Sequence, residues 1–93
     1  MSLQIRLTLH ERDLLINLLS IEPEILKRLK HAMLQNNSIT INVDDGELDV
    51  LLGAVAADAN HPPNHKVEKD LNALFHRLDE ILRIHLSTNK GAG

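Results

Sequence analysis

The sequence predicts an α+β, mostly helical fold, with two short strands and four helices in the order β-α-α-β-α-α. Two segments, 3–9 and 39–43, alternate strictly between apolar and polar residues, which is the period of a strand with one buried face. The segments that follow each of them repeat apolar residues every three or four positions, as amphipathic helices do. A chain of 93 residues, 43% of them hydrophobic, is long enough for one small core.

The first strand leads into two helices. Thr8 and Glu11 have the spacing of a capping box, in which each side chain binds a free backbone N–H at a helix start. We expect this helix to run to about Leu19. Pro23 suits the first position of the next helix, because its missing N–H would have no partner there, and this helix is expected to end near Leu34. The residues expected to face the core are Leu14, Leu15, Leu18 and Leu19 in the first helix, and Ile25, Leu26, Leu29, Met33 and Leu34 in the second.

The second strand also leads into a helix with a capping-box pattern. Asp44 and Glu47 supply that pattern, and the helix is expected to cover 45–59. It is rich in small residues, which would let another helix approach it closely. These residues are Gly53, Ala54, Ala56 and Ala57.

The longest helix is expected at the end of the chain. Two consecutive prolines place a loop over 60–64, because proline cannot continue a helix. Apolar residues then step by four and three positions from Val67 to Ile81, and the helix is expected to run from residue 65 or 66 to Leu86. We therefore expect one domain over 1–86 and a flexible tail over 87–93.

The two halves of the chain resemble each other. With an offset of 34 positions, the segment Ile5–Leu19 overlays Ile39–Gly53, so that Ile5 matches Ile39 and Leu7 matches Ile41. A true duplication predicts a pseudo-two-fold axis between two β-α-α units, an antiparallel strand pair and four helices on one face of the sheet. A coincidental likeness leaves a parallel pair, joined through two helices, equally open.

Charge and composition exclude several classes of function. The formal net charge is −3, and the stretch 44–60 holds five acidic residues and no basic one, which argues against nucleic acid as the main partner. Phe75 is the only aromatic residue, so stacking surfaces for bases are missing. The absence of cysteine excludes disulfides and thiolate zinc sites. No apolar run approaches the ~20 residues of a membrane helix, so a cytoplasmic protein without a membrane partner is expected.

One dense basic group stands out, formed by Lys27, Arg28, Lys30 and His31. Such a group is typical of the solvated end of an amphipathic helix. It also suits a phosphate, an acidic partner, or the acidic stretch 44–60 of a neighbouring chain.

A metal site is the sharpest chemical hypothesis that the sequence offers. Asp58, His61 and His65 are ligand types for a divalent cation, and they lie close together around the proline loop. The alternative is structural, with Asn60 ending one helix and Asn64 capping the next. No other cofactor and no catalytic residue is predicted, because no phosphate loop, nucleophile elbow or zinc-protease motif occurs.

The function that we expect is a small, non-enzymatic protein–protein interaction or regulatory module that acts as a homo-oligomer. A two-stranded sheet is marginal in water and leaves two edges exposed, and a small core gains from a partner. The alternatives are a metal-binding protein or small enzyme around Asp58, and a DNA-binding regulator that uses the helix 23–34. His85 occupies the next position of the apolar stripe along the last helix, and a histidine in such a seam between chains would make association sensitive to pH. The residues predicted to form the interface are Leu71, Leu74, Phe75, Leu78, Ile81, Leu82 and His85.

Overall fold

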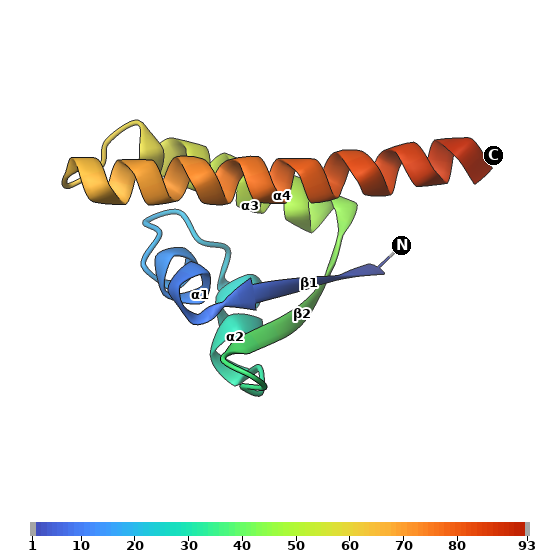
Figure 1. The fold of residues 1–93 in the computed structure, drawn as a ribbon, viewed down its shortest axis with the longest axis horizontal. Coiled ribbons are helices and arrows are strands. Elements are labelled where there is room, and N and C mark those ends of the chain that lie inside the picture. The colour runs from blue at the N-terminus through green and yellow to red at the C-terminus, as the bar shows by residue number, and fades with distance from the viewer. Residues whose placement is uncertain (1, 93) are drawn as a thin grey trace.

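The computed structural model describes the backbone of residues 2–92 and the side chains of residues 2–87. It confirms the predicted fold class and the order β-α-α-β-α-α (Figure 1). The elements are β1 (Ser2–Thr8), α1 (Leu9–Ile16), α2 (Pro23–His31), β2 (Ser38–Asp44), α3 (Asp45–Ala59) and α4 (His65–Ala92).

The sheet consists of β1 and β2, which pair antiparallel. Ile5 lies directly opposite Ile41, and Leu7 lies opposite Ile39. These four side chains are at most 4% exposed, whereas the residues that alternate with them are exposed. The sheet therefore has one buried and one solvated face, as the alternating sequence requires.

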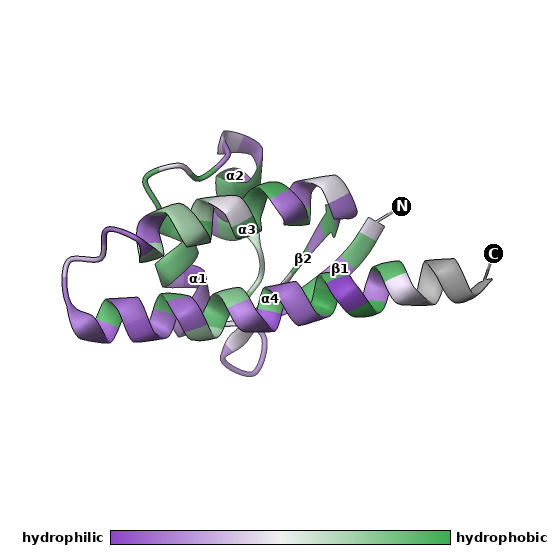
Figure 2. Ribbon diagram, turned by 90° about the horizontal axis from the view of Figure 1, so that it is seen from above, coloured by the Kyte–Doolittle hydropathy of each residue, from purple (hydrophilic) through white to green (hydrophobic). Residues whose placement is uncertain are grey.

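All six elements contribute to one hydrophobic core. In Figure 1, α3 and α4 run side by side above the strands, and α1 lies at the end of β1. Among the described side chains no polar or charged one is buried, so every core contact is apolar. Hydrophobic and hydrophilic residues alternate along α4 in Figure 2, which is the pattern of an amphipathic helix with one packed face.

Both helices of the first half end earlier than the sequence predicts. α1 ends at Asn17, whose side-chain amide donates to the carbonyl of Asp13, the same acceptor that its backbone N–H uses. Leu18 still reaches the core, but Leu19 is 92% exposed, so its predicted inward position is wrong.

The end of α2 is likewise set by the turn that comes after it. Asn36 and Asn37 have φ angles of 52° and 62°, and Gln35 bridges Ser38, so the chain reverses direction tightly before β2. The residues between α2 and this turn are no longer helical. The predicted inward positions of Met33 and Leu34 are therefore wrong, since these side chains are 78% and 54% exposed.

The last helix is longer than predicted. Its backbone continues to Ala92, six positions beyond Leu86, because the segment contains no proline to interrupt the helical hydrogen bonds. The side chains of 88–92 and all of Gly93 lie outside the described residues, so the flexibility of the tail stays a prediction.

The two halves correspond with an offset of 36 positions, not 34. The capping boxes of α1 and α3 both form, and Thr8 and Glu11 lie 36 positions before Asp44 and Glu47. The strands have equal lengths and the same offset. A strand pattern repeats every two residues, so alternation cannot distinguish offsets that differ by two. The correspondence ends within the helices, since α3 has 15 residues and α1 has 8.

One of the small residues in α3 does not serve close packing. A Cβ atom added at Gly53 would meet nothing within 4 Å, so the close approach predicted there is wrong. Ala54, next to it, is buried at 6% exposure.

Candidate functional site

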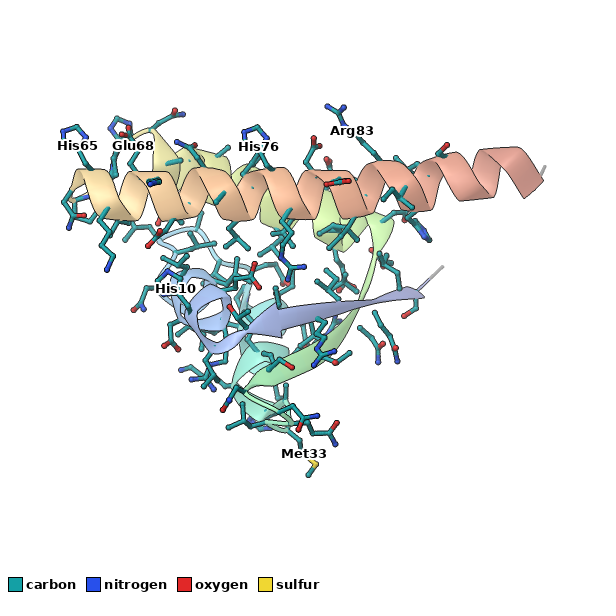
Figure 3. The ribbon with its side chains drawn as sticks, in the orientation of Figure 1. His10, Met33, His65, Glu68, His76 and Arg83 are labelled. Carbon is teal, nitrogen blue, oxygen red and sulfur yellow. The ribbon has the colours of Figure 1, made fainter. Side chains whose placement is uncertain are left out.

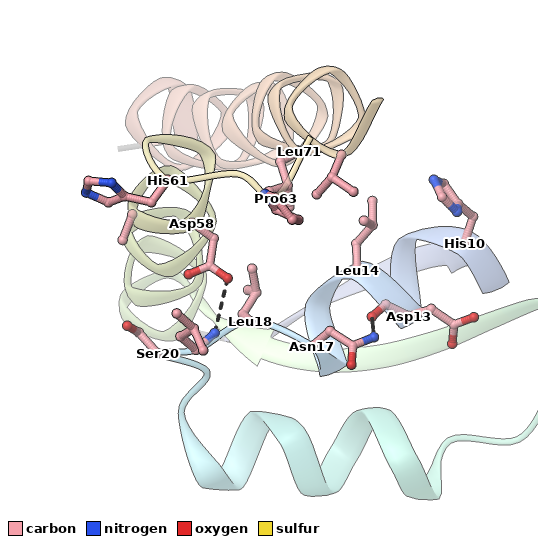
Figure 4. Close-up of a pocket in the computed structure, with 13 residues that line it drawn as sticks. His10, Asp13, Leu14, Asn17, Leu18, Ser20, Asp58, His61, Pro63 and Leu71 are labelled. Carbon is pink, nitrogen blue, oxygen red and sulfur yellow. Dashed lines mark hydrogen bonds between the residues drawn. The ribbon is translucent and has the colours of Figure 1, made fainter. Parts of the chain in front are cut away.

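A cavity of about 630 Å³ opens between α1, the loop after it, the end of α3 and the start of α4 (Figure 4). This volume lies within the range of pockets that hold small ligands or anchoring side chains. Most of its wall is apolar. The apolar lining residues are Leu14, Leu18, Leu19, Ala57, Pro63, Val67 and Leu71.

Local sequence signals build the walls of this cavity. Because α1 stops at Asn17, the next residues cross toward α3, where the backbone N–H of Leu19 donates to Asp58 Oδ2 at 3.1 Å (Figure 4). On the other side, Asn64 caps α4 by accepting from the Val67 N–H at 2.9 Å. The structural role predicted for Asn64 is thus confirmed.

The polar part of the lining contains two carboxylates together with His10, Asn17, Ser20 and His61. Its carboxylates are those of Asp13 and Asp58, and none of the lining residues is Lys or Arg. Asp13 forms an ion pair at 3.0 Å with Arg12, which lies outside the lining, whereas Asp58 has no ion pair among the described residues. The cavity therefore suits an apolar group that carries positive charge beside it.

The structure does not bring the three predicted metal ligands together. Asp58 and His61 both line the cavity, but Figure 4 shows the His61 ring directed away from the Asp58 carboxylate. His65 lies outside the lining, with Nδ1 3.6 Å from Glu68 Oε1 in the next turn. Within the described residues, no group of three or more His, Asp or Glu side chains is arranged to hold a metal ion.

The seam predicted on α4 is divided between core and surface. Leu71, Leu74 and Leu78 are at most 3% exposed within a single chain, because they pack into the core that α4 shares with α3. A second chain therefore cannot reach Leu74 and Leu78 while the fold is intact, and it can reach Leu71 only through the cavity that this residue lines. The remaining predicted interface residues are partly buried: Phe75, Ile81, Leu82 and His85.

Sequence reasoning missed an arginine that joins α4 to the start of α1. Arg77 Nε lies 2.6 Å from Glu11 Oε2, and Arg77 Nη2 lies 2.8 Å from Oε1. The same guanidinium donates to the carbonyl of Arg6. Burial acts to raise the pKa of Glu11, but the hydrogen bonds from Arg77 and from the Thr8 N–H outweigh it and hold that pKa below its ordinary value.

A second arginine has the same role at α3. Arg28 donates to both carboxylate oxygens of Glu47, at 2.9 and 2.8 Å, and to the carbonyl of Asn42 at 3.1 Å. These bonds, with the Asp44 N–H, lower the pKa of Glu47, and the pKa of Arg28 is raised by the same pairing. Arg28 is therefore bound within its own chain and does not belong to a free basic patch. The sequence signal that could have found it is the glutamate of the capping box.

The remaining basic residues are exposed in the second half of α2, and two exposed apolar residues follow the end of this helix. We call this surface the α2 tip, and it consists of Lys27, Lys30, His31, Met33 and Leu34. Figure 3 shows Met33 directed away from the body, on the side of the strands opposite α4. Other large apolar side chains that are exposed among the described residues are Leu19, Val50, Ile84 and Leu86.

Comparison with known proteins does not assign this chain to a family. No protein-family model, no curated protein and no solved structure matches it. No helix in the described part of the chain is long and apolar enough to cross a membrane.

Proposed function

We propose that this chain is a non-enzymatic protein-interaction module that acts as a homo-oligomer. One observation carries the proposal: exposed apolar side chains border an open apolar cavity. Leu19 is 92% exposed, although it lies at the wall of the cavity and next to the buried Leu18. An exposed apolar side chain next to an apolar cavity is typical of a surface that a partner covers.

The roles of the charged groups support a binding rather than a catalytic module. Glu11 and Glu47 each cap a helix and pair with an arginine, and Asp58 binds the backbone of the loop over 18–20. These carboxylates stabilise helix starts and loop positions. Acid–base catalysis would need titratable groups converging on one reacting atom.

The measurement that tests this function is the solution mass as a function of concentration. Sedimentation velocity from about 1 μM to about 500 μM should show a weight-average mass that rises above one chain, as mass action requires for a reversible oligomer. A mass of one chain, 10.4 kDa, throughout this range would overturn the proposal.

A further inference from the structure

Two surfaces of the molecule complement each other in polarity and charge. The cavity is apolar, and its lining contains two carboxylates and no Lys or Arg: Asp13 is paired with Arg12 outside the lining, and Asp58 has no ion pair among the described residues. The α2 tip is also apolar, but it carries Lys27 and Lys30. One surface is concave and acidic, and the other protrudes and is basic.

The sign of the charge at the tip is uniform over a long segment. Residues 25–43 contain no Asp or Glu, and Arg28 is already paired with Glu47, which leaves Lys27, Lys30 and His31 as the other basic residues of α2, ahead of the apolar pair in the sequence. Both side chains of that pair, Met33 and Leu34, are more than half exposed. Methionine is unbranched and adapts its shape to irregular pockets, so it suits an anchor.

A chain cannot place its own tip in its own cavity. Figure 3 shows Met33 beyond the strands, on the side away from α4, whereas Val67 and Leu71 of α4 form part of the cavity wall. The tight turn at Asn36 and Asn37 further ties the tip to the start of β2. The tip is therefore free to meet only another molecule.

We propose that the cavity receives the α2 tip of a second copy of this chain. Met33 and Leu34 enter the apolar cavity, and Lys27 and Lys30 lie on the side of Asp58, the lining carboxylate that has no ion pair among the described residues. The cavity volume of about 630 Å³ provides room for both apolar side chains. This inference rests on the proposed homo-oligomer and names the contact that forms it.

The contact is heterologous, since a different surface is used on each chain. The pair then keeps one free cavity and one free tip for further neighbours, so the assembly grows into a ring or an open chain. A two-fold dimer built on the cavity face would place the two cavities together and the tips apart. The heterologous contact and the two-fold dimer predict different species in a mixture of variants.

The test uses one variant that lacks the tip and one that lacks the cavity. Met33→Glu combined with Leu34→Glu adds two acids at exposed positions and leaves the cavity unchanged. Ala57→Lys places a long cation at the exposed wall of the cavity and leaves the tip unchanged. Matched controls are Val50→Glu, at an exposed apolar residue of α3, and Ala73→Lys, at an exposed alanine of α4 outside the cavity.

We expect each test variant alone to weaken self-association about 30-fold or more, and the controls to leave it within about threefold. A mixture of the two test variants should form a one-to-one complex and no larger species, because only one intact tip and one intact cavity remain. Far-ultraviolet circular dichroism and the midpoint of thermal unfolding verify that each variant is folded. If Ala57→Lys disturbs the fold, Leu19→Lys replaces it at a side chain that is 92% exposed.

The outcomes separate this inference from the proposed function. An oligomeric parent whose association either test variant leaves unchanged overturns the inference and keeps the oligomer. The same holds if both variants are monomeric and their mixture stays monomeric. A parent that is monomeric throughout the concentration range overturns both.

Discussion

Arg77 donates hydrogen bonds to both carboxylate oxygens of Glu11, 66 positions away in the sequence, with N–O distances of 2.6 and 2.8 Å. The glutamate is also the third residue of α1 and accepts the N–H of Thr8, the residue that caps this helix. One carboxylate thus closes the start of α1 and binds α4 to it. Such bidentate, charge-assisted bonds are stronger than bonds between neutral groups.

The pair formed by Arg28 and Glu47 repeats this arrangement in the other half. Arg28 comes from a helix of the first half and pairs with the capping-box glutamate of α3 in the second, whereas Arg77 comes from the second half and pairs with that of α1 in the first. The two carbonyls that accept the arginines, of Arg6 and Asn42, are also 36 positions apart. Each half therefore holds the other through its second helix.

Replacing Arg77 should loosen α4 from the rest of the chain. We expect Arg77→Met to lower the free energy of unfolding by about 1–2 kcal/mol, because Glu11 loses two charged donors at a partly solvated site. The control is Arg83→Met, since Arg83 is 79% exposed and, among the described side chains, forms an ion pair with Asp79 one turn away; this change should cost at most about 0.5 kcal/mol. Urea unfolding of both variants measures the difference, and equal losses would contradict the role of Arg77.

Stability should fall in acid partly through Glu11. Its pKa lies below the ordinary 4.5 in the folded chain, so the unfolded chain binds the proton first as the pH falls. The stabilisation from Glu11 is therefore fully present above about pH 5 and is lost as the pH drops through its folded pKa. We expect the difference in unfolding free energy between the parent and Glu11→Gln to be constant near neutral pH and to shrink in acid. A difference that grows in acid would show the opposite sign of the shift.

Filling the open position in α3 should stabilise the protein. Gly53→Ala adds a methyl group where nothing lies within 4 Å and removes the freedom of glycine in the unfolded chain. We expect a gain of about 0.5–1 kcal/mol in urea unfolding. Gly46→Ala is the comparison, because its Cβ would lie 3.4 Å from the capping oxygen of Asp44, and it should gain less.

The buried part of α4 should matter far more than its exposed end. Leu78 is 0% exposed, so Leu78→Ala should cost about 2–5 kcal/mol by leaving a cavity in the core. Ile84 is 59% exposed, and Ile84→Ala should change the unfolding free energy by at most about 0.5 kcal/mol. Both values should be independent of protein concentration in dilute samples, because Leu78 packs within one chain.

The turn before β2 depends on residues that tolerate positive φ. Asn37 has a φ of 62°, so Asn37→Val should cost at least about 1 kcal/mol, since a branched side chain is strained there. Asn37→Gly should be neutral or stabilising, because Asn-Gly is the favoured pair in such two-residue turns. Thermal unfolding of both variants measures the effect. An unchanged unfolding midpoint for Asn37→Val would show that the turn tolerates a different geometry.

Local patterns predicted the elements of this fold well. Both capping boxes, the proline at the first position of α2 and the loop over 60–64 depend on residues at most four positions apart, and all of them form. Errors appeared where a pattern continued past the point at which the chain turned. Leu19, Met33 and Leu34 fit the helical period but follow residues that end their helices.

The candidate site was only partly accessible to prediction. Asp58 and His61 were recognised as neighbours, but their shared place at an apolar cavity depends on how the loop over 18–20 crosses to α3. The α2 tip was visible as a basic group, although the turn that exposes its apolar residues was not. Periodicity shows that a residue is apolar and on one face, and it does not show which surface covers that face.

The alternation and the spacing of caps determine where this chain makes strands and helices, since these choices depend on hydrogen bonds and contacts between near neighbours. The antiparallel register, the burial of Leu71, Leu74 and Leu78, and the pairing of Arg77 with Glu11 were decided when distant segments packed together. Such contacts form between residues far apart in the chain, and their geometry follows from the shape of the whole core. The pattern of a single segment does not show which distant residues that segment will contact.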